Sequence, residues 1–181
     1  AIKLGKSLLA VPLGWRDHAL QIKGSEVSAE SFNAPARGSP PQNKDEEVFA
    51  MIQNGGKGDA KKGLNRVGKD VLFFVLEGEQ HQRAGKFAIY FFNNTARPEA
   101  SNAYAFRGKK CTVVSHRIST SSFTWYVPQI TVDGDGSISR QDYPELPTEV
   151  EMIEEMTKFL NPVAKAREAD SNTTTPTGNP R

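Results

Sequence analysis

The chain reads Val71-Leu72-Phe73-Phe74-Val75-Leu76-Glu77 near its centre and Lys86-Phe87-Ala88-Ile89-Tyr90-Phe91-Phe92 after a polar loop that contains Gly78 and Gly85. β-branched and aromatic residues dominate both segments, which predicts two strands that pair antiparallel. The second segment places apolar side chains on both of its faces, so both faces need a cover. The sequence therefore predicts a sheet covered on both sides, either by a second sheet and a helix or by a neighbouring chain.

Shorter segments of the same character extend this sheet. Strands are expected at 7–13 and 19–23 around a turn at 14–17, at 110–115 and 122–127, and with less support at 103–106. Residues 46–53 fit a short helix or a strand equally well. The predicted fold class is a β-rich α+β domain, a mostly antiparallel sheet or sandwich.

One amphipathic helix is expected near the C-terminus. Thr148 and Glu151 have the spacing of a capping box, and the apolar positions that follow form one stripe up to Asn161. Residues 1–170 are predicted to form a single domain, with a Pro/Ser-rich extended arm at 24–45. Residues 171–181 form a polar tail without an apolar side chain.

The composition limits the class of function. Lys and Arg total 23 and Asp and Glu total 21, so the net charge of +2 does not by itself indicate a nucleic-acid partner. The three histidines lack metal-ligand spacing and are expected to be hydrogen-bonded structural or surface residues. No Gly-x-Ser-x-Gly or Cys-x-x-Cys motif occurs, so we expect a protein that is not an enzyme. The single Cys111 is expected to be a buried, inert thiol.

The location of the protein is inferred from its apolar segments. No secretion signal is indicated, and no apolar run approaches the length that spans a bilayer. We therefore expect no membrane partner. We expect the protein in a virion or in the cytoplasm.

The most basic part of the sequence is a glycine-rich segment at 54–69. Its cations are Lys57, Lys61, Lys62, Arg66 and Lys69. Mobile cations follow an anionic backbone well, so these five are the candidate nucleic-acid contacts. The alternative is a solvated loop with no partner.

Residues 131–142 carry alternating carboxylates and glycines and resemble an EF-hand calcium loop. The candidate ligands are Asp133, Asp135 and Asp142. Thr131 stands at the first ligand position, and a predicted strand precedes the loop where an EF-hand has a helix. Three interpretations remain open: a plain hairpin with Asp-Gly turns, a hairpin that also holds calcium, and a true EF-hand.

Aromatic and cationic side chains are interleaved across the predicted sheet. The cations are Arg83, Lys86, Arg107, Lys109, Lys110 and Arg117, and the rings beside them are Phe87, Tyr90, Tyr104, Phe106, Trp125 and Tyr126. Sheets that bind single strands use cations for phosphates and rings for bases. Core aromatics with charged strand ends would give the same pattern.

These features favour a non-enzymatic, self-assembling structural protein, such as a viral or phage coat or decoration subunit. Its partners would be further copies of the chain, and nucleic acid would contact the basic segment. One alternative is a module that binds RNA or single-stranded DNA. The other is a calcium-stabilised binding domain, with calcium as its one expected cofactor.

Overall fold

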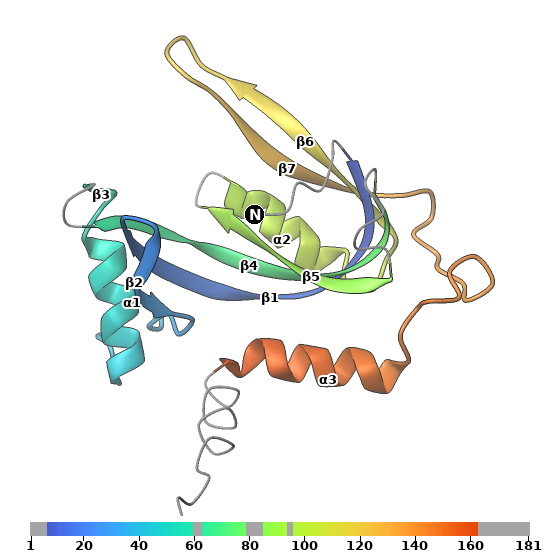
Figure 1. The fold of residues 1–181 in the computed structure, drawn as a ribbon, viewed down its shortest axis with the longest axis horizontal. Helices are drawn as coiled ribbons and strands as arrows, with labels where there is room; N and C mark the ends of the chain where they lie inside the picture. Colours follow the sequence, from blue (N-terminus) through green and yellow to red (C-terminus); the bar gives the residue numbers. More distant parts are fainter. Residues whose placement is uncertain (1–6, 60–62, 79–84, 94–95, 163–181) are drawn as a thin grey trace, which may run out of the picture. The chain divides into compact units, whose positions relative to one another are not determined.

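The computed structural model describes residues 7–59, 63–78, 85–93 and 96–162, and it divides into two compact units, Ala1–Leu146 and Pro147–Arg181. The first unit contains β1 (Ser7–Lys23), β2 (Glu26–Ser31), α1 (Lys44–Asn54), β3 (Gly58–Asp59), β4 (Gly63–Gly78), β5 (Lys86–Asn93), α2 (Arg97–Ala105), β6 (Cys111–Ser119) and β7 (Thr124–Val132) (Figure 1). The second contains α3 (Glu149–Leu160). The predicted β-rich α+β fold is confirmed.

The sheet is built around β1 and β4. These two strands pair antiparallel along almost their whole length, from Leu8 opposite Gly78 to Ile22 opposite Leu64. The strand order is β3-β4-β1-β6-β7, with β2 also paired to β1 and β5 also paired to β4. The edge of β1 that faces away from β4 therefore holds β6 with its first residues and β2 with its last. Every pairing among the described strands is antiparallel.

The predicted turn at 14–17 is wrong, because β1 is one strand of 17 residues. Its register against β4 shifts between Leu9 and Ala10, and again between Pro12 and Gly14. Such bulges bend a strand without ending it. The turn-type residues Pro12 and Gly14 thus mark a bend within β1.

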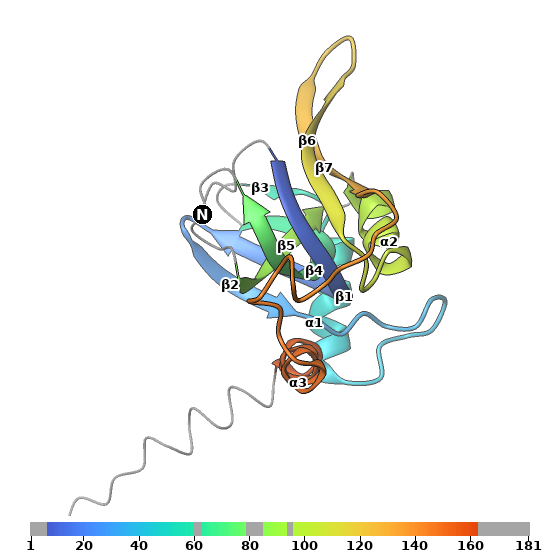
Figure 2. The same ribbon diagram turned by 90° about the vertical axis from the view of Figure 1, so that its right-hand side faces the viewer.

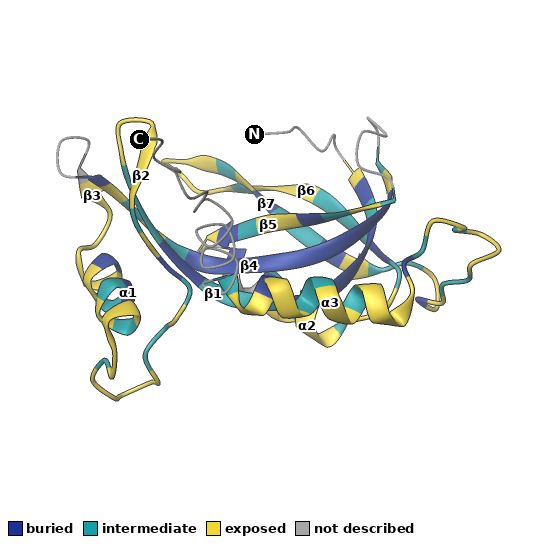
Figure 3. Cartoon of the chain, turned by 60° about the horizontal axis from the view of Figure 1, so that its bottom comes forward, coloured by how far each residue is buried: buried dark blue, intermediate teal, exposed yellow. Residues whose placement is uncertain are grey.

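The central strand pair is confirmed. Phe74 lies opposite Phe87, and the pairing continues to Gly68 opposite Asn93. The middle of β4 is buried on both faces (Figure 3). The expected cover on both faces of 86–92 is wrong, because Ile89 of β5 is 53% exposed and Tyr90 is 39% exposed. One core joins side chains of β1, β4, β5, α2, β6 and β7: Leu8, Ala10, Val71, Phe73, Val75, Ala88, Phe92, Ala96, Ala100, Ala103, Cys111, Val127 and Ile130.

The predicted strand at 103–106 is wrong, because these residues belong to the end of α2 and the turn after it. Ala96, Ala100 and Ala103 lie one helical turn apart and are buried together in the core, which explains the choice of helix. A proline in the first turn suits the start of a helix. The Glu99 Oε2 atom accepts a hydrogen bond of 3.0 Å from the Ile130 backbone nitrogen, which ties α2 to β7.

The extended arm predicted at 24–45 is wrong in part. Residues 26–31 form β2, paired with β1, and α1 begins at Lys44, whereas residues 32–43 form no helix or strand. Phe49 and Ile52 of α1 pack with Ala19 in a second core cluster, so this segment belongs to the fold of the first unit. Residues 46–53 are therefore helical, and the predicted tail at 171–181 lies outside the described residues.

The helix α3 has the predicted capping box. The Glu151 backbone nitrogen donates to Thr148 Oγ1 at 3.2 Å, and the Thr148 backbone nitrogen donates to Glu151 Oε2 at 2.7 Å. Two donors that have no partner inside the helix are thereby satisfied. Among the helices of the described ranges, none is long and apolar enough to cross a membrane.

Cys111 is fully buried in the core, as predicted, and burial raises the pKa of its thiol to about 11. We expect the folded protein to react slowly with a disulfide reagent at pH 8. The thiolate is the reactive species, and the raised pKa alone lowers its population at pH 8 by about 100-fold. The colorimetric thiol assay should show one thiol only after guanidinium is added. Rapid modification of the folded protein would contradict the buried position.

Candidate nucleic-acid interface

The hairpin of β6 and β7 extends away from the rest of the sheet (Figures 1 and 2). Two rings near its end are exposed, Phe123 by 73% and Tyr126 by 65%. Arg117 lies directly opposite Tyr126 in the register, so the two side chains leave the same face of the hairpin. We call Arg117, Phe123 and Tyr126 the hairpin patch.

The turn of the hairpin is held by hydrogen bonds. The Thr120 backbone nitrogen donates to the Phe123 carbonyl oxygen at 2.8 Å, and the Phe123 nitrogen donates to Thr120 Oγ1 at 3.1 Å. The hydroxyl groups of Ser119 and Thr124 are 3.1 Å apart across the hairpin. The Phe123 backbone is therefore fixed while its ring stays exposed.

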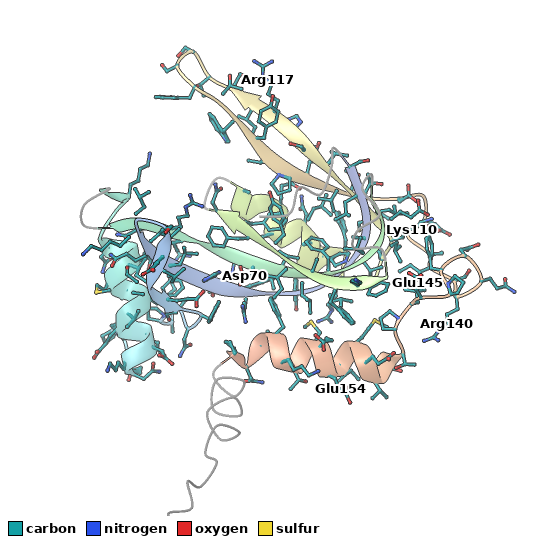
Figure 4. The ribbon with its side chains drawn as sticks, viewed as in Figure 1. Asp70, Lys110, Arg117, Arg140, Glu145 and Glu154 are labelled. Atoms are coloured by element: carbon teal, nitrogen blue, oxygen red, sulfur yellow. The ribbon has the colours of Figure 1, made fainter. Side chains whose placement is uncertain are left out.

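The two faces of the hairpin have different roles. Ile118 and Trp125 lie opposite one another and pack against the core, and they leave the face opposite to that of Arg117 and Tyr126. The Trp125 Nε1 atom is buried with no hydrogen-bond partner among the described residues. The Arg117 guanidinium has no hydrogen-bond acceptor among the described residues, and it points away from the sheet (Figure 4). One face thus anchors the hairpin, and the other presents a cation beside a ring.

A second group of rings and cations lies on β1, β4 and α2. The Lys69 Nζ atom is 3.1 Å from the centre of the Trp15 ring, and Trp15 meets Tyr104 edge to face at 6.2 Å between ring centres. Arg107 Cζ is 5.5 Å from the Tyr104 ring centre. Lys69 is 7% exposed and Tyr104 is 55% exposed. We call these four residues the Trp15–Tyr104 column, which runs from a buried lysine to an exposed arginine.

The structure changes the interpretation of the basic segment at 54–69. The prediction of a loop is wrong from Gly63 onward, because β4 begins at that residue. Lys69 is buried and forms an ion pair of 2.9 Å with Asp17, so it is not accessible to a phosphate. Of the other four cations, Lys57 and Arg66 are exposed. Lys61 and Lys62 lie outside the described ranges.

The acidic segment after β7 forms turns. Gly136 donates its backbone N–H to the Asp133 carbonyl at 2.9 Å. Residues 137–139 are not a strand, so the interpretation as a plain hairpin lacks its second strand. Asp133 forms an ion pair of 3.1 Å with Lys110. The hydrogen bond from Lys110 to Asp133 within this ion pair raises the pKa of Lys110. Hydrogen bonds from Ser137 lower the pKa of Asp135.

The third candidate ligand also has a local partner, because Ser139 donates its hydroxyl to Asp142 at 2.7 Å. No group of three His, Cys, Asp or Glu side chains that could hold a metal ion occurs within the described ranges. The structure therefore does not bring Asp133, Asp135 and Asp142 together as a ligand set. Calcium binding stays a prediction, and the melting temperature with and without calcium would test it.

A polar network across β1, β2 and β4 was not predicted from the sequence. The Asp70 carboxylate accepts hydrogen bonds from the Arg16 guanidinium at 3.0 and 3.1 Å and lies 2.9 Å from His18 Nδ1. The other ring nitrogen of His18 is 2.9 Å from Glu30 Oε1. The prediction that histidine here is hydrogen-bonded and structural is confirmed for His18.

The comparisons with known proteins leave the site to be interpreted from its own geometry. No protein-family model matches the chain, and no curated protein or solved structure matches it.

Proposed function

We propose that the protein is a single-stranded nucleic-acid-binding module whose contact surface includes the hairpin patch. The observation that carries the proposal is the pair of exposed rings, Phe123 and Tyr126, with Arg117 opposite Tyr126 and unpaired within the described residues. Rings of this kind stack on bases, and a guanidinium binds phosphates or stacks on a base.

The connectivity of the first unit supports this proposal. The strands β1, β4 and β5 are paired in succession, α2 follows, and the β6–β7 hairpin returns to pair β6 with β1 (Figure 1). This order resembles the five-stranded OB-fold, in which oligonucleotides contact the loop between the first two strands and the loop between the last two. The corresponding segments here are 24–62, with Lys57, Lys61 and Lys62, and the hairpin turn at 120–123. Such a likeness is an analogy, and the side chains carry the proposal.

Direct binding tests the proposal. Fluorescence anisotropy with labelled 16-nucleotide oligo(dT) and oligo(rU) should show saturable binding that weakens as salt rises. A duplex of the same length and heparin, which has charge but no bases, should bind more weakly. No binding to either single strand at 50 mM salt, or equal affinity for heparin, would refute the proposal.

Replacing Lys57, Lys61, Lys62 and Arg66 with glutamine should flatten the salt dependence of that binding. Removing one phosphate interaction lowers the slope of log K against log salt by about 0.7 for a single strand. The matched control replaces Arg140 and Lys158 with glutamine, two exposed cations outside both contact segments. An unchanged slope in the first variant would show that these four cations do not bind the phosphates.

Self-assembly remains a second proposal for this chain, and one of its supports is weakened. Part of the segment at 24–45 that was expected to reach across neighbouring copies is packed on its own sheet, through β2 and Ala34. Light scattering after size-exclusion chromatography, with and without oligo(dT), measures the assembly state directly. A particle of many copies without nucleic acid would favour the coat-subunit hypothesis over a simple binding module.

A further inference from the structure

We propose that Tyr104 and Arg107, the exposed end of the Trp15–Tyr104 column, form a second stacking subsite for a base of the same single strand. This inference rests on the proposed function and extends it from the hairpin patch to α2. The proposed ligand is one nucleotide of a single strand. It would bind the Tyr104 ring and the Arg107 guanidinium, to which the fold alone assigns no role.

The subsite is held by rigid elements. Trp15 lies in β1 opposite Val71 of β4, and the buried Lys69 covers one face of its ring while paired with Asp17. Trp15 in turn meets Tyr104 edge to face. A ring that is fixed in this way loses little conformational entropy when a base stacks on it.

The end of α2 is fixed as well. Ala100 and Ala103 are fully buried, and Phe106 packs partly against the same core. The Gly108 backbone nitrogen donates to the Pro12 carbonyl of β1 at 2.9 Å, which joins the turn after α2 to the sheet. The orientation of Tyr104 is therefore set by the core and not by a mobile loop.

The charge of this surface is complementary to a phosphate backbone. Arg107 has no ion-pair partner among the residues that the structure describes, and neither has the neighbouring exposed Lys109. Lys69 does not contribute, because Asp17 neutralises it. The positive charge available to a ligand therefore lies at the solvent end of the column, beside the exposed Tyr104 ring.

The subsite is within reach of a strand that is bound at the hairpin. The hydrogen bond of 3.0 Å between Glu99 and the Ile130 backbone marks the place where α2 meets β7. From Ile130 to Tyr126 the strand rises about 13 Å, and from Glu99 to Tyr104 the helix rises about 7.5 Å. Single-strand sites on one OB-type fold cover about 4–16 nucleotides, so one strand is long enough to reach both places.

The experiment uses Trp15 as its own reporter. In Trp125→Phe, Trp15 is the one remaining tryptophan, and it contacts Tyr104. Titration with 16-nucleotide oligo(dT) should change Trp15 fluorescence saturably, with the same Kd that anisotropy gives. Adding Tyr104→Leu should remove this change and weaken binding about 5- to 150-fold, the range for the removal of one base stack.

Two further variants separate stacking from folding. Tyr104→Phe keeps the ring and should bind like the parent, whereas Arg107→Gln should weaken binding and flatten its salt dependence. Arg140→Gln is the matched control for the removal of an exposed arginine. Thermal melting by circular dichroism checks that each variant is folded.

The outcomes distinguish the subsite from the proposed function. If the wild type binds oligo(dT) and Tyr104→Leu, folded, binds equally tightly, the subsite is wrong and the proposed function stands. If the wild type binds no single strand, both are wrong. Weaker binding by Tyr104→Leu but not by Tyr104→Phe, together with the Trp15 signal, supports the subsite.

Discussion

Replacing Asp70 with alanine lowers the free energy of unfolding by about 3–5 kcal/mol, the cost of removing one partner from a buried ion pair. Asp70 is 3% exposed and bonded to both Arg16 and His18. The substitution removes, in a mostly buried place, the carboxylate that accepts two hydrogen bonds from Arg16 and faces His18 Nδ1. It also opens a space between β1 and β4, the two strands on which the sheet is built.

Guanidinium denaturation followed by circular dichroism measures this effect. The melting temperature should also fall, by about 2–4 °C for each kcal/mol in a domain of this size. Asp133→Ala is the matched control, because its ion pair with Lys110 is partly exposed to solvent and should contribute far less to stability. If Asp70→Ala is as stable as that control, the network does not stabilise the sheet.

Replacing both Phe123 and Tyr126 with alanine should weaken binding to single strands by about 30-fold or more. Each stacked base contributes about 1–3 kcal/mol, and this variant removes two rings. Because both rings are exposed, the free energy of unfolding should change by less than about 0.5 kcal/mol for each substitution. The effect is therefore on binding and not on folding.

The matched control for this double variant replaces Val150 and Ile153 with alanine, two exposed apolar residues on α3. It should bind oligo(dT) like the wild type. Anisotropy at fixed salt compares the three proteins. Wild-type affinity in the Phe123 and Tyr126 variant would show that the hairpin patch does not bind the strand.

The parts of the fold that were predicted correctly depend on local patterns. The strand pair at 71–77 and 86–92 follows from runs of β-branched and aromatic residues, and the capping box of α3 lies within four positions. The errors occur where pairing with residues far away in the sequence determines the local structure. The continuous β1 replaces a predicted turn because β4 pairs with it on both sides of the bend at Pro12.

The candidate site was only partly predictable for the same reason. Tyr126, Tyr104, Arg107 and Arg117 belong to the interleaved set of rings and cations, but the sequence does not tell which rings face the core. Trp125 and Tyr126 alternate in a strand, and only the packing of Trp125 on the core decides that Tyr126 faces out. Phe123 is absent from the predicted set, although the predicted strand at 122–127 contained it. The structure places it in the hairpin turn, because β7 begins only at Thr124.

The buried network shows the same limit. Asp70 directly precedes an apolar run. An acidic residue next to such a run indicates a buried partner for its carboxylate. The sequence prediction nevertheless assigned Asp70 no role. Its partner Arg16 is 54 positions away, and the register of β1 against β4 brings the two together. No local pattern specifies that register.

The most direct test of the proposed function uses Trp15→Phe, which leaves Trp125 in the hairpin as the sole tryptophan. This variant is titrated with 16-nucleotide oligo(dT) while the Trp125 emission is recorded. A saturable change that weakens with salt is the predicted result, because bases stacked on Phe123 and Tyr126 alter the surroundings of the ring that lies between them in the sequence. An emission that stays constant while anisotropy shows full binding, together with wild-type affinity in the Phe123 and Tyr126 variant, would place the binding surface elsewhere and contradict the assignment of the hairpin patch.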